Sequence, residues 1–189
     1  MSLHTTSSQT VGPFFRIGLE AGFVPVVAGP EIPGEHVVIR GRVLDGDGKP
    51  VPDAVIETWQ ADANGVYNDP EDARSGSAPE GFIGFGRVPT DDEGYFSITS
   101  IKPGRVPGPG ETLQAPHLVV VVFMRGLLRH LVTRMYFPDE PENAEDPILA
   151  LVPADWRQTL IAQRDAEREG ALIWDLNLQG EQETVFFDV

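Results

Sequence analysis

The sequence predicts an all-β protein: a β-sandwich of about eight short strands with long loops and one short helix near residues 155–170. Two observations favour this class. The 189 residues include 20 glycines and 17 prolines, a frequency that interrupts long helices and supplies turns. Short segments in which apolar and polar residues alternate recur between these turns, which is typical of half-buried strands.

The chain divides into two parts of different pattern. Residues 1–34 have little hydrophobic periodicity, and we interpret them as an extended N-terminal arm and loop that Gly12-Pro13 bends. Regular alternation begins at Glu35, so residues 35–189 are expected to form a single β-sandwich domain. A chain of this length can bury a substantial core within one domain.

The first strand is expected at residues 36–44, where Val37, Ile39 and Val43 share one face and the turn Asp45–Gly48 follows. Further strands are expected at residues 54–60, 95–99, 117–124, 127–137, 171–178 and 184–187.

Two long loops and one helix complete the prediction. Residues 68–90 and 102–116 are rich in proline and glycine, and we expect a functional site, if there is one, at the edge where these loops lie. Asp155 and Gln158 have the spacing of a capping box, which predicts that the helix begins there and runs to about Gly170.

Charge and cysteine content exclude several classes of site. With 14 Lys and Arg against 29 Asp and Glu, the net charge is −15, which disfavours nucleic acid and anionic lipid as partners. The absence of cysteine excludes disulfides, thiolate metal sites and cysteine nucleophiles. The N-terminus lacks a signal-peptide pattern and no apolar run is long enough to span a membrane, so a cytoplasmic location is expected.

The residues able to bind a hard metal ion are scattered along the chain. The four histidines, His4, His36, His117 and His130, form neither a His-x-His nor a His-Glu-x-x-His pattern. A Gly-x-Ser-x-Gly nucleophile motif and a phosphate-binding loop are also absent. Taken by themselves, these residues give little support to a metal centre or to a serine hydrolase.

One segment nevertheless resembles a known signature. Residues 59–67, Trp-Gln-Ala-Asp-Ala-Asn-Gly-Val-Tyr, resemble the motif of the intradiol ring-cleavage dioxygenases. Shorter matches follow in the family's order over most of residues 35–140, at residues 84–87, 92–95, 101–104, 115–117 and 134–137. The resemblance implies a β-sandwich and an O2-dependent, Fe(III)-dependent cleavage of an aromatic diol between its two hydroxyl-bearing carbons.

In that family two tyrosines and two histidines bind the iron. By resemblance, Tyr67 matches one tyrosine and His117 one histidine, whereas Val106 and Val119 stand at the other two positions. Valine has no donor atom, so the resemblance implies that this chain binds no metal and that Tyr67 and His117 are vestigial. It also implies that a homologous β subunit binds the Fe(III) and that the two chains form an obligate hetero-oligomer of several such pairs.

The resemblance further implies which residues still serve the reaction. Thr10, Gly12 and Pro13 match arm residues that line the substrate pocket at the interface between the two chains. Arg125 matches an arginine that reaches the same pocket, which implies a catalytic and substrate-binding role. A guanidinium there would stabilise an anionic aromatic substrate.

Two other interpretations stay open at this point. The first is a non-catalytic, transthyretin-like binding or interaction module, since the same sandwich occurs in such domains. The second is a self-sufficient enzyme of altered ligation that uses Tyr67, His117 and a carboxylate.

Overall fold

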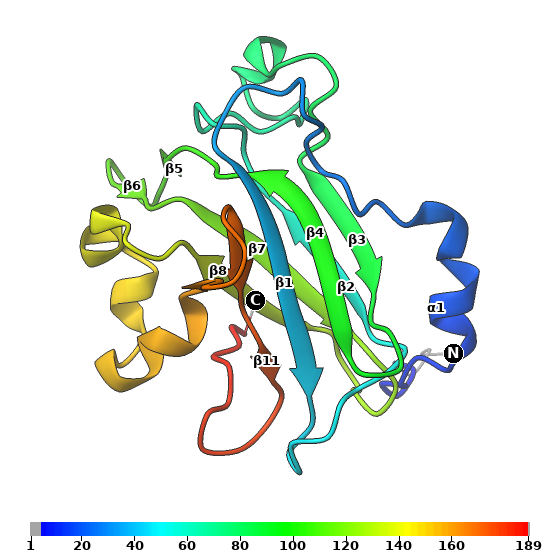
Figure 1. The fold of residues 1–189 in the computed structure, drawn as a ribbon. Helices are drawn as coiled ribbons and strands as arrows, with labels where there is room; N and C mark the ends of the chain where they lie inside the picture. Colours follow the sequence, from blue (N-terminus) through cyan, green and yellow to red (C-terminus); the bar gives the residue numbers. More distant parts are fainter. Residues whose placement is uncertain (1–4, 189) are drawn as a thin grey trace.

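Two stacked β-sheets form the body of the molecule in the computed structural model, which describes residues 5–188 (Figure 1). One sheet has the order β11-β1-β10-β9, with β4 paired to the other edge of β1; the second sheet has the order β3-β2-β7-β8. The first sheet comprises β1 (His36–Leu44), β4 (Tyr95–Ile101), β9 (Gln163–Arg164), β10 (Ala171–Ile173) and β11 (Leu176–Asn177). The second comprises β2 (Val55–Trp59), β3 (Phe85–Pro89), β7 (His117–Phe123) and β8 (Leu131–Tyr136). The predicted all-β sandwich is confirmed.

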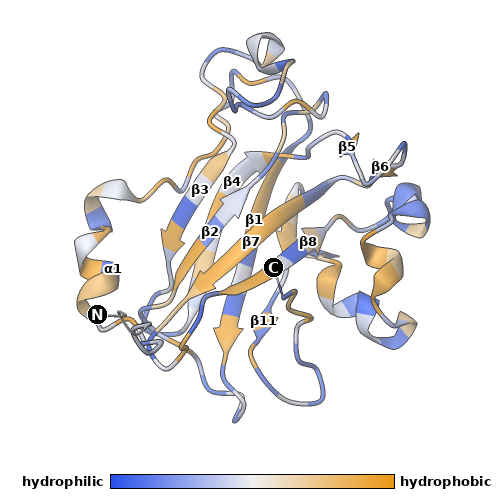
Figure 2. Cartoon of the chain, turned by 180° about the vertical axis from the view of Figure 1, so that it is seen from behind, coloured by the Kyte–Doolittle hydropathy of each residue, from blue (hydrophilic) through white to orange (hydrophobic). Residues whose placement is uncertain are grey.

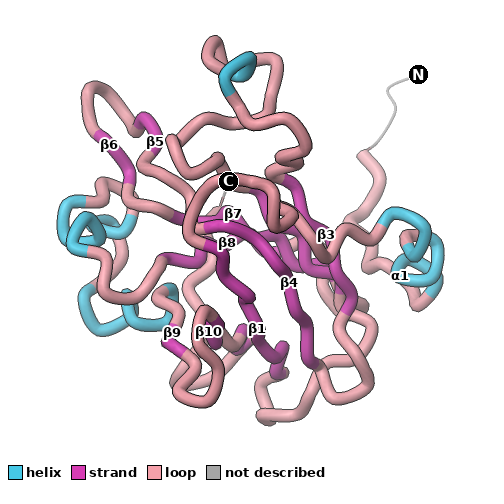
Figure 3. The backbone as a smooth tube through the Cα atoms, turned by 45° about the horizontal axis from the view of Figure 1, so that its top comes forward, coloured by secondary structure: helices cyan, strands magenta, loops and turns pink. Residues whose placement is uncertain are grey.

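The remaining elements are short. A hairpin of β5 (Val106–Pro107) and β6 (Leu113–Gln114) extends from the sandwich next to the start of β7. The only α-helix among residues 5–188 is α1 (Phe14–Gly18). The 3-10 helices are η1 (Glu20–Gly22), η2 (Ser75–Ser77), η3 (Pro141–Glu145), η4 (Leu149–Leu151) and η5 (Ala154–Leu160). The last three lie on one side of the sheets and α1 on the other (Figure 3).

The core lies between the two sheets, where alternate residues of each strand point inward. In β1 the predicted face of Val37, Ile39 and Val43 is buried, and it packs with residues from the second sheet such as Ile56 and Val122. Burying this apolar surface on both inner faces is the main stabilisation of such a sandwich. The register of both sheets is fixed because a one-residue slip would expose these side chains.

The second half of the N-terminal segment does not form a free arm, because it is attached to this core. Val24 and Val26 bridge to Arg87 and Thr99, and Val27 and Ala28 are completely buried. The division of the chain at residue 34 stays a prediction. Residues 5–22 contain no buried residue and no such bridge.

The helix predicted for residues 155–170 is much shorter in the structure. Only η5 forms, as a 3-10 helix without a side-chain cap, and the chain after it turns into β9. Tertiary pairing explains the difference. Ile161 bridges to Tyr136 in parallel, and Gln163 pairs with β10, so backbone hydrogen bonds to the sheets replace those of a helix.

The outer face of the second sheet carries alternate residues of β7, among them two of the predicted ligand positions. His117, Val119 and Val121 alternate with buried Leu118 and Val120, so they point away from the inter-sheet core. Seen from this side, β7 is the most continuously apolar strand (Figure 2). No helix within residues 5–188 is long and apolar enough to cross a membrane.

Candidate functional site

The turn that ends at Tyr67 is built around one buried carboxylate. Oδ1 of Asp62 accepts the backbone N–H groups of Asn64 (2.8 Å) and Val66 (2.9 Å). Gly65 has a φ of 75°, and a Cβ there would lie 1.9 Å from the carbonyl oxygen of Arg105. Glycine is therefore required at this position, and the turn presents Tyr67 to the outer face of the second sheet.

Tyr67 stacks on Trp59, with ring centroids 5.9 Å apart and an interplanar angle of 7°. Its backbone N–H donates to Oδ2 of Asp72 at 3.1 Å. Burial raises the pKa of the Tyr67 phenol, the carboxylate of Asp72 raises it further, and the guanidinium of Arg134 opposes both. The phenol is therefore neutral at neutral pH and cannot act as a tyrosinate without a strong cation beside it.

His117 opens β7 and is buried. Its Nδ1 lies 2.7 Å from the carbonyl oxygen of Ala115, and its ring lies 5.7 Å from that of Tyr136. Burial lowers the pKa of His117 to about 4, with the positive charge of Arg134 acting in the same direction. The imidazole is therefore neutral, and the carbonyl contact assigns the proton to Nδ1.

The two predicted valine positions lie near these side chains on neighbouring strands. Val106 is 3% exposed and pairs with Gln114 in the β5–β6 hairpin. Val119 lies between Trp59 of β2 and Arg134 of β8 in the sheet register. One phenol and one imidazole are thus the remaining donors, and within residues 5–188 no group of three or more His, Cys, Asp or Glu residues could hold a metal ion. This donor set does not fit a ferric ion.

Arg134 and Gln114 were not identified as site residues from the sequence. Nη1 of Arg134 donates to Oε1 of Gln114 at 2.6 Å, and its charge acts on both Tyr67 and His117. The sequence feature that could have pointed to Arg134 is the alternation within residues 130–136, which places it on the same face as Tyr136. The position of Gln114 required the hairpin register.

A second group of predicted residues lies at the other end of β7. Oγ1 of Thr10 accepts the backbone N–H of Gly126 at 2.7 Å, so the arm is fastened to the turn that follows β7. In the same turn, Nε of Arg125 lies 3.3 Å from Oδ2 of Asp53, and the Arg125 side chain is 58% exposed. The structure therefore brings Thr10 and the Arg125 turn together.

Gly12 and Pro13 continue this surface. Pro13 precedes the first residue of α1, and the carbonyl oxygen of Gly12 accepts the N–H of Phe15 at 3.0 Å. A Cβ added at Gly12 would meet no atom of this chain within 4 Å. Between the arm and the turn lies a hollow of about 210 Å³, lined by Gln9, Val11, Phe123, Met124, Leu127, Leu128, Arg129 and His130.

The two groups do not form one site within this chain. His117 begins β7 and Phe123 ends it, so at roughly 3.3 Å per residue the strand separates them by about 20 Å. Arg125 lies beyond Phe123, farther still from Tyr67 and His117. The loop edge at which a site was predicted therefore holds Tyr67 and His117, whereas Arg125 and the arm lie at the opposite edge.

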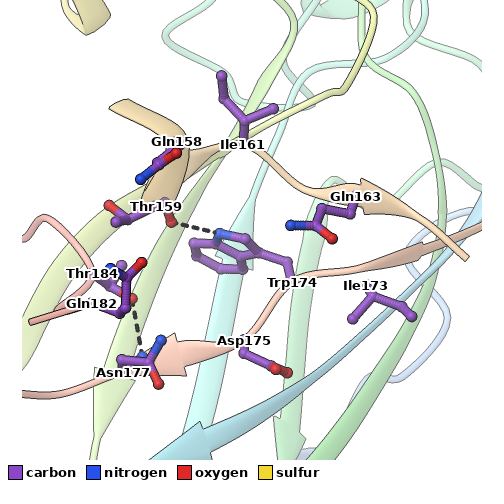
Figure 4. Close-up of a pocket in the computed structure, with 10 residues that line it drawn as sticks. All are labelled: Gln158, Thr159, Ile161, Gln163, Ile173, Trp174, Asp175, Asn177, Gln182 and Thr184. Carbon is purple, nitrogen blue, oxygen red and sulfur yellow. Dashed lines mark hydrogen bonds between the residues drawn. The ribbon is translucent and has the colours of Figure 1, made fainter. Parts of the chain in front are cut away.

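A polar pocket of about 300 Å³ lies elsewhere, between η5 and the strands β9, β10 and β11 (Figure 4). Its polar groups are partly engaged with one another. Nε1 of Trp174 donates to the carbonyl oxygen of Thr159, and the N–H of Asn177 donates to Oγ1 of Thr184, both at 3.0 Å. None of the predicted site residues lines this pocket.

Comparison with known proteins identifies the family of this chain. Residues 18–180 match the sequence model of a family described as "Dioxygenase". The protocatechuate 3,4-dioxygenase alpha chain of Burkholderia cepacia is 44% identical over 202 residues, which cover 100% of this chain and 99% of the relative. The chain belongs to the intradiol dioxygenase family.

A second sequence relative and a solved structure are also similar to this chain. The protocatechuate 3,4-dioxygenase beta chain of Burkholderia cepacia is 38% identical over 158 residues, covering 80% of this chain and 67% of the relative. The dioxygenase domain of a carbohydrate-binding fusion protein from Streptomyces sp. SirexAA-E superimposes with a TM-score of 0.63 at 25% identity, covering 86% of this chain and 89% of that one. The resemblance identified from residues 59–67 is confirmed.

Proposed function

We propose that this chain is the α subunit of a protocatechuate 3,4-dioxygenase and that a homologous β subunit binds the Fe(III). The complex would cleave protocatechuate with O2 to 3-carboxy-cis,cis-muconate, with both oxygen atoms entering the product. The alpha-chain relative matches over the whole length, whereas the beta-chain relative matches at lower identity over 80% of the chain. Several α–β pairs per complex and a cytoplasmic location belong to the same proposal. The relatives give no support to the alternative of a stand-alone interaction module.

The observation that carries this proposal is the separation of the two groups along β7. Arg125 and Thr10 lie more than the strand's length, about 20 Å, from Tyr67 and His117. They are too far away to act on a substrate at this chain's own former metal positions. Residues of the arm and the Arg125 turn can act in ring cleavage only if another chain brings its iron to this edge.

The chemistry of the partner's iron would be to bind and activate the diol for reaction with O2. The residues of this chain would bind and orient the substrate. The guanidinium of Arg125 suits the substrate's carboxylate because it offers parallel N–H donors and a fixed charge. The backbone at Gly12 leaves open space in this chain, which fits close approach of a ligand or a partner.

The surface beside this group supports contact with a partner. Phe14 and Ile17 of α1 are 81% and 53% exposed, and Leu128 in the turn after β7 is also exposed. In the view from behind, apolar residues of α1 lie on the same side as the end of β7 (Figure 2). Exposed apolar side chains that gather at one edge are typical of protein interfaces.

The test is Arg125→Ala in the complex of this chain with its partner. We expect kcat/KM for protocatechuate to fall about 10- to 100-fold, because a charge-assisted hydrogen bond contributes about 1.5–3 kcal/mol. Steady-state oxygen uptake measures the effect, and size-exclusion chromatography shows that the complex still assembles.

Arg164→Ala is the matched control. Arg164 lies in β9 of the other sheet, has a 61% exposed side chain, and is 3.0 Å from the carboxylate of Asp139. Its loss changes the net charge of the chain equally but should leave kcat/KM within about twofold. Equal kinetics for Arg125→Ala and the unmodified complex would remove Arg125 from the site.

A further inference from the structure

The two valines at the former donor positions are connected by their neighbours. Val106 lies opposite Gln114 in the β5–β6 hairpin, and Val119 lies opposite Arg134 between β7 and β8. Nη1 of Arg134 donates to Oε1 of Gln114 at 2.6 Å. The cross-strand partners of both valines are therefore bound to each other.

This hydrogen bond fixes a positive charge beside both positions. Residues directly opposite in an antiparallel pair have Cβ atoms about 5 Å apart on the same face of the sheet. A side chain at position 119 therefore lies next to the Arg134 side chain. The same guanidinium acts electrostatically on the two surviving donors, Tyr67 and His117.

Among residues 5–188, no carboxylate lies within ion-pair distance of the Arg134 guanidinium, and one of its hydrogen-bond partners is the neutral amide of Gln114. The buried carboxylate of Asp146 is separated from it by the Tyr136 hydroxyl, which donates to Oδ1 of Asp146 at 3.0 Å and also interacts with Arg134. Arginine stays protonated at all physiological pH values. A ferric ion bound between these strands would meet this fixed charge in a half-buried setting, where repulsion is weakly screened.

We infer that the guanidinium of Arg134, held by Gln114, is the resident cation of the former metal site and itself excludes a ferric ion. Replacing Val106 and Val119 by donor residues is then insufficient to restore metal binding. This inference rests on the proposed function in one respect, namely that the iron of the complex belongs to the partner chain.

The experiment compares three variants of the full chain in complex with its partner. Val106→Tyr with Val119→His restores both donors and keeps Arg134; the second variant adds Arg134→Gln, and a matched third adds Arg134→Lys. Iron per pair of chains and ferric-tyrosinate absorbance are measured after incubation with Fe(III). We expect one additional iron per pair only in the Arg134→Gln variant.

A second comparison leaves the β5–β6 hairpin unchanged, so it remains informative if the variants with Val106→Tyr fail to fold. Val119→His is compared with Val119→His plus Arg134→Gln, and we expect at least tenfold tighter Fe(III) binding in the latter. Additional iron in a variant that keeps Arg134 or carries lysine there would overturn the inference. Equal Fe(III) binding with and without Arg134→Gln in both comparisons would also overturn it. Iron in the unmodified chain itself would instead contradict the proposed function.

Discussion

His117 shows how burial and a neighbouring charge set the protonation state of one residue. Its ring is buried, its Nδ1 contacts the carbonyl oxygen of Ala115, and Arg134 adds a nearby positive charge. Both burial and this charge disfavour the imidazolium form. The residue therefore contributes to stability as a neutral, packed side chain, and that contribution depends on pH.

We expect the free energy of unfolding of the isolated chain to decrease as the pH falls from about 6.5 to about 4. Across this window the unfolded chain, in which the pKa of His117 is near its ordinary value of 6.5, binds a proton that the folded chain excludes until its own pKa of about 4. The loss is at most about 3 kcal/mol and ends below pH 4. Urea unfolding at pH 4.5 and pH 7 measures it.

His117→Gln should flatten this pH dependence, because glutamine does not titrate. His130→Gln is the control, since His130 is exposed and its loss should leave the slope unchanged. The same slope in both variants would show that another group causes the effect.

Among the secondary-structure elements, those with a one-sided hydrophobic pattern could be predicted. The strands β1, β4 and β7 form where alternation or a continuous apolar run was seen, because one face of each must be buried between the sheets. β3 was assigned to a loop because Gly84 and Gly86 flank Phe85 in a segment rich in turn residues. Gly86 is nevertheless part of the strand, where its missing Cβ makes room for Val27 and Thr58.

Local signals misled where long-range pairing decides the structure. Asp155 and Gln158 have capping spacing, yet the chain after Leu160 pairs with β8 and β10 instead of continuing a helix. The arm was expected to be extended, and α1 interrupts it. Such segments are stabilised by contacts with distant residues, which a single sequence does not show.

The arm can be tested as an element through Gly12. Gly12→Ala should leave the stability of this chain unchanged, because the new methyl group meets nothing within 4 Å. In the assembled complex we expect KM for protocatechuate to rise about tenfold, since overpacking a filled pocket typically costs 1–3 kcal/mol. Thermal unfolding and steady-state kinetics measure the two effects.

Gly76→Ala is the matched control for this substitution. Gly76 lies in η2, far from the arm in the fold, and a Cβ there also meets nothing within 4 Å. It should change neither stability nor KM. A KM in the Gly12→Ala complex equal to that of the Gly76→Ala complex would exclude Gly12 from the pocket wall.

At the scale of the whole molecule, the sandwich separates two groups of predicted site residues. Val106 and His117 lie at or next to the β5–β6 hairpin, and the arm with Arg125 lies at the other end of β7. The sequence motifs suggested both groups, because each of these residues lies within its own short motif. They did not identify Arg134 and Gln114 as neighbours, because that relation depends on the pairing of separate strands.

The most direct test of the account is the iron content of the purified chain, with and without its partner, read together with the visible absorbance. Since Tyr67 and His117 are the only donors at the four predicted ligand positions and Arg134 lies near them, we predict that the chain alone is colourless and free of iron. The complex should contain one ferric ion per pair of chains and show ferric-tyrosinate absorbance. One ferric ion bound with that absorbance by the chain alone would contradict the account.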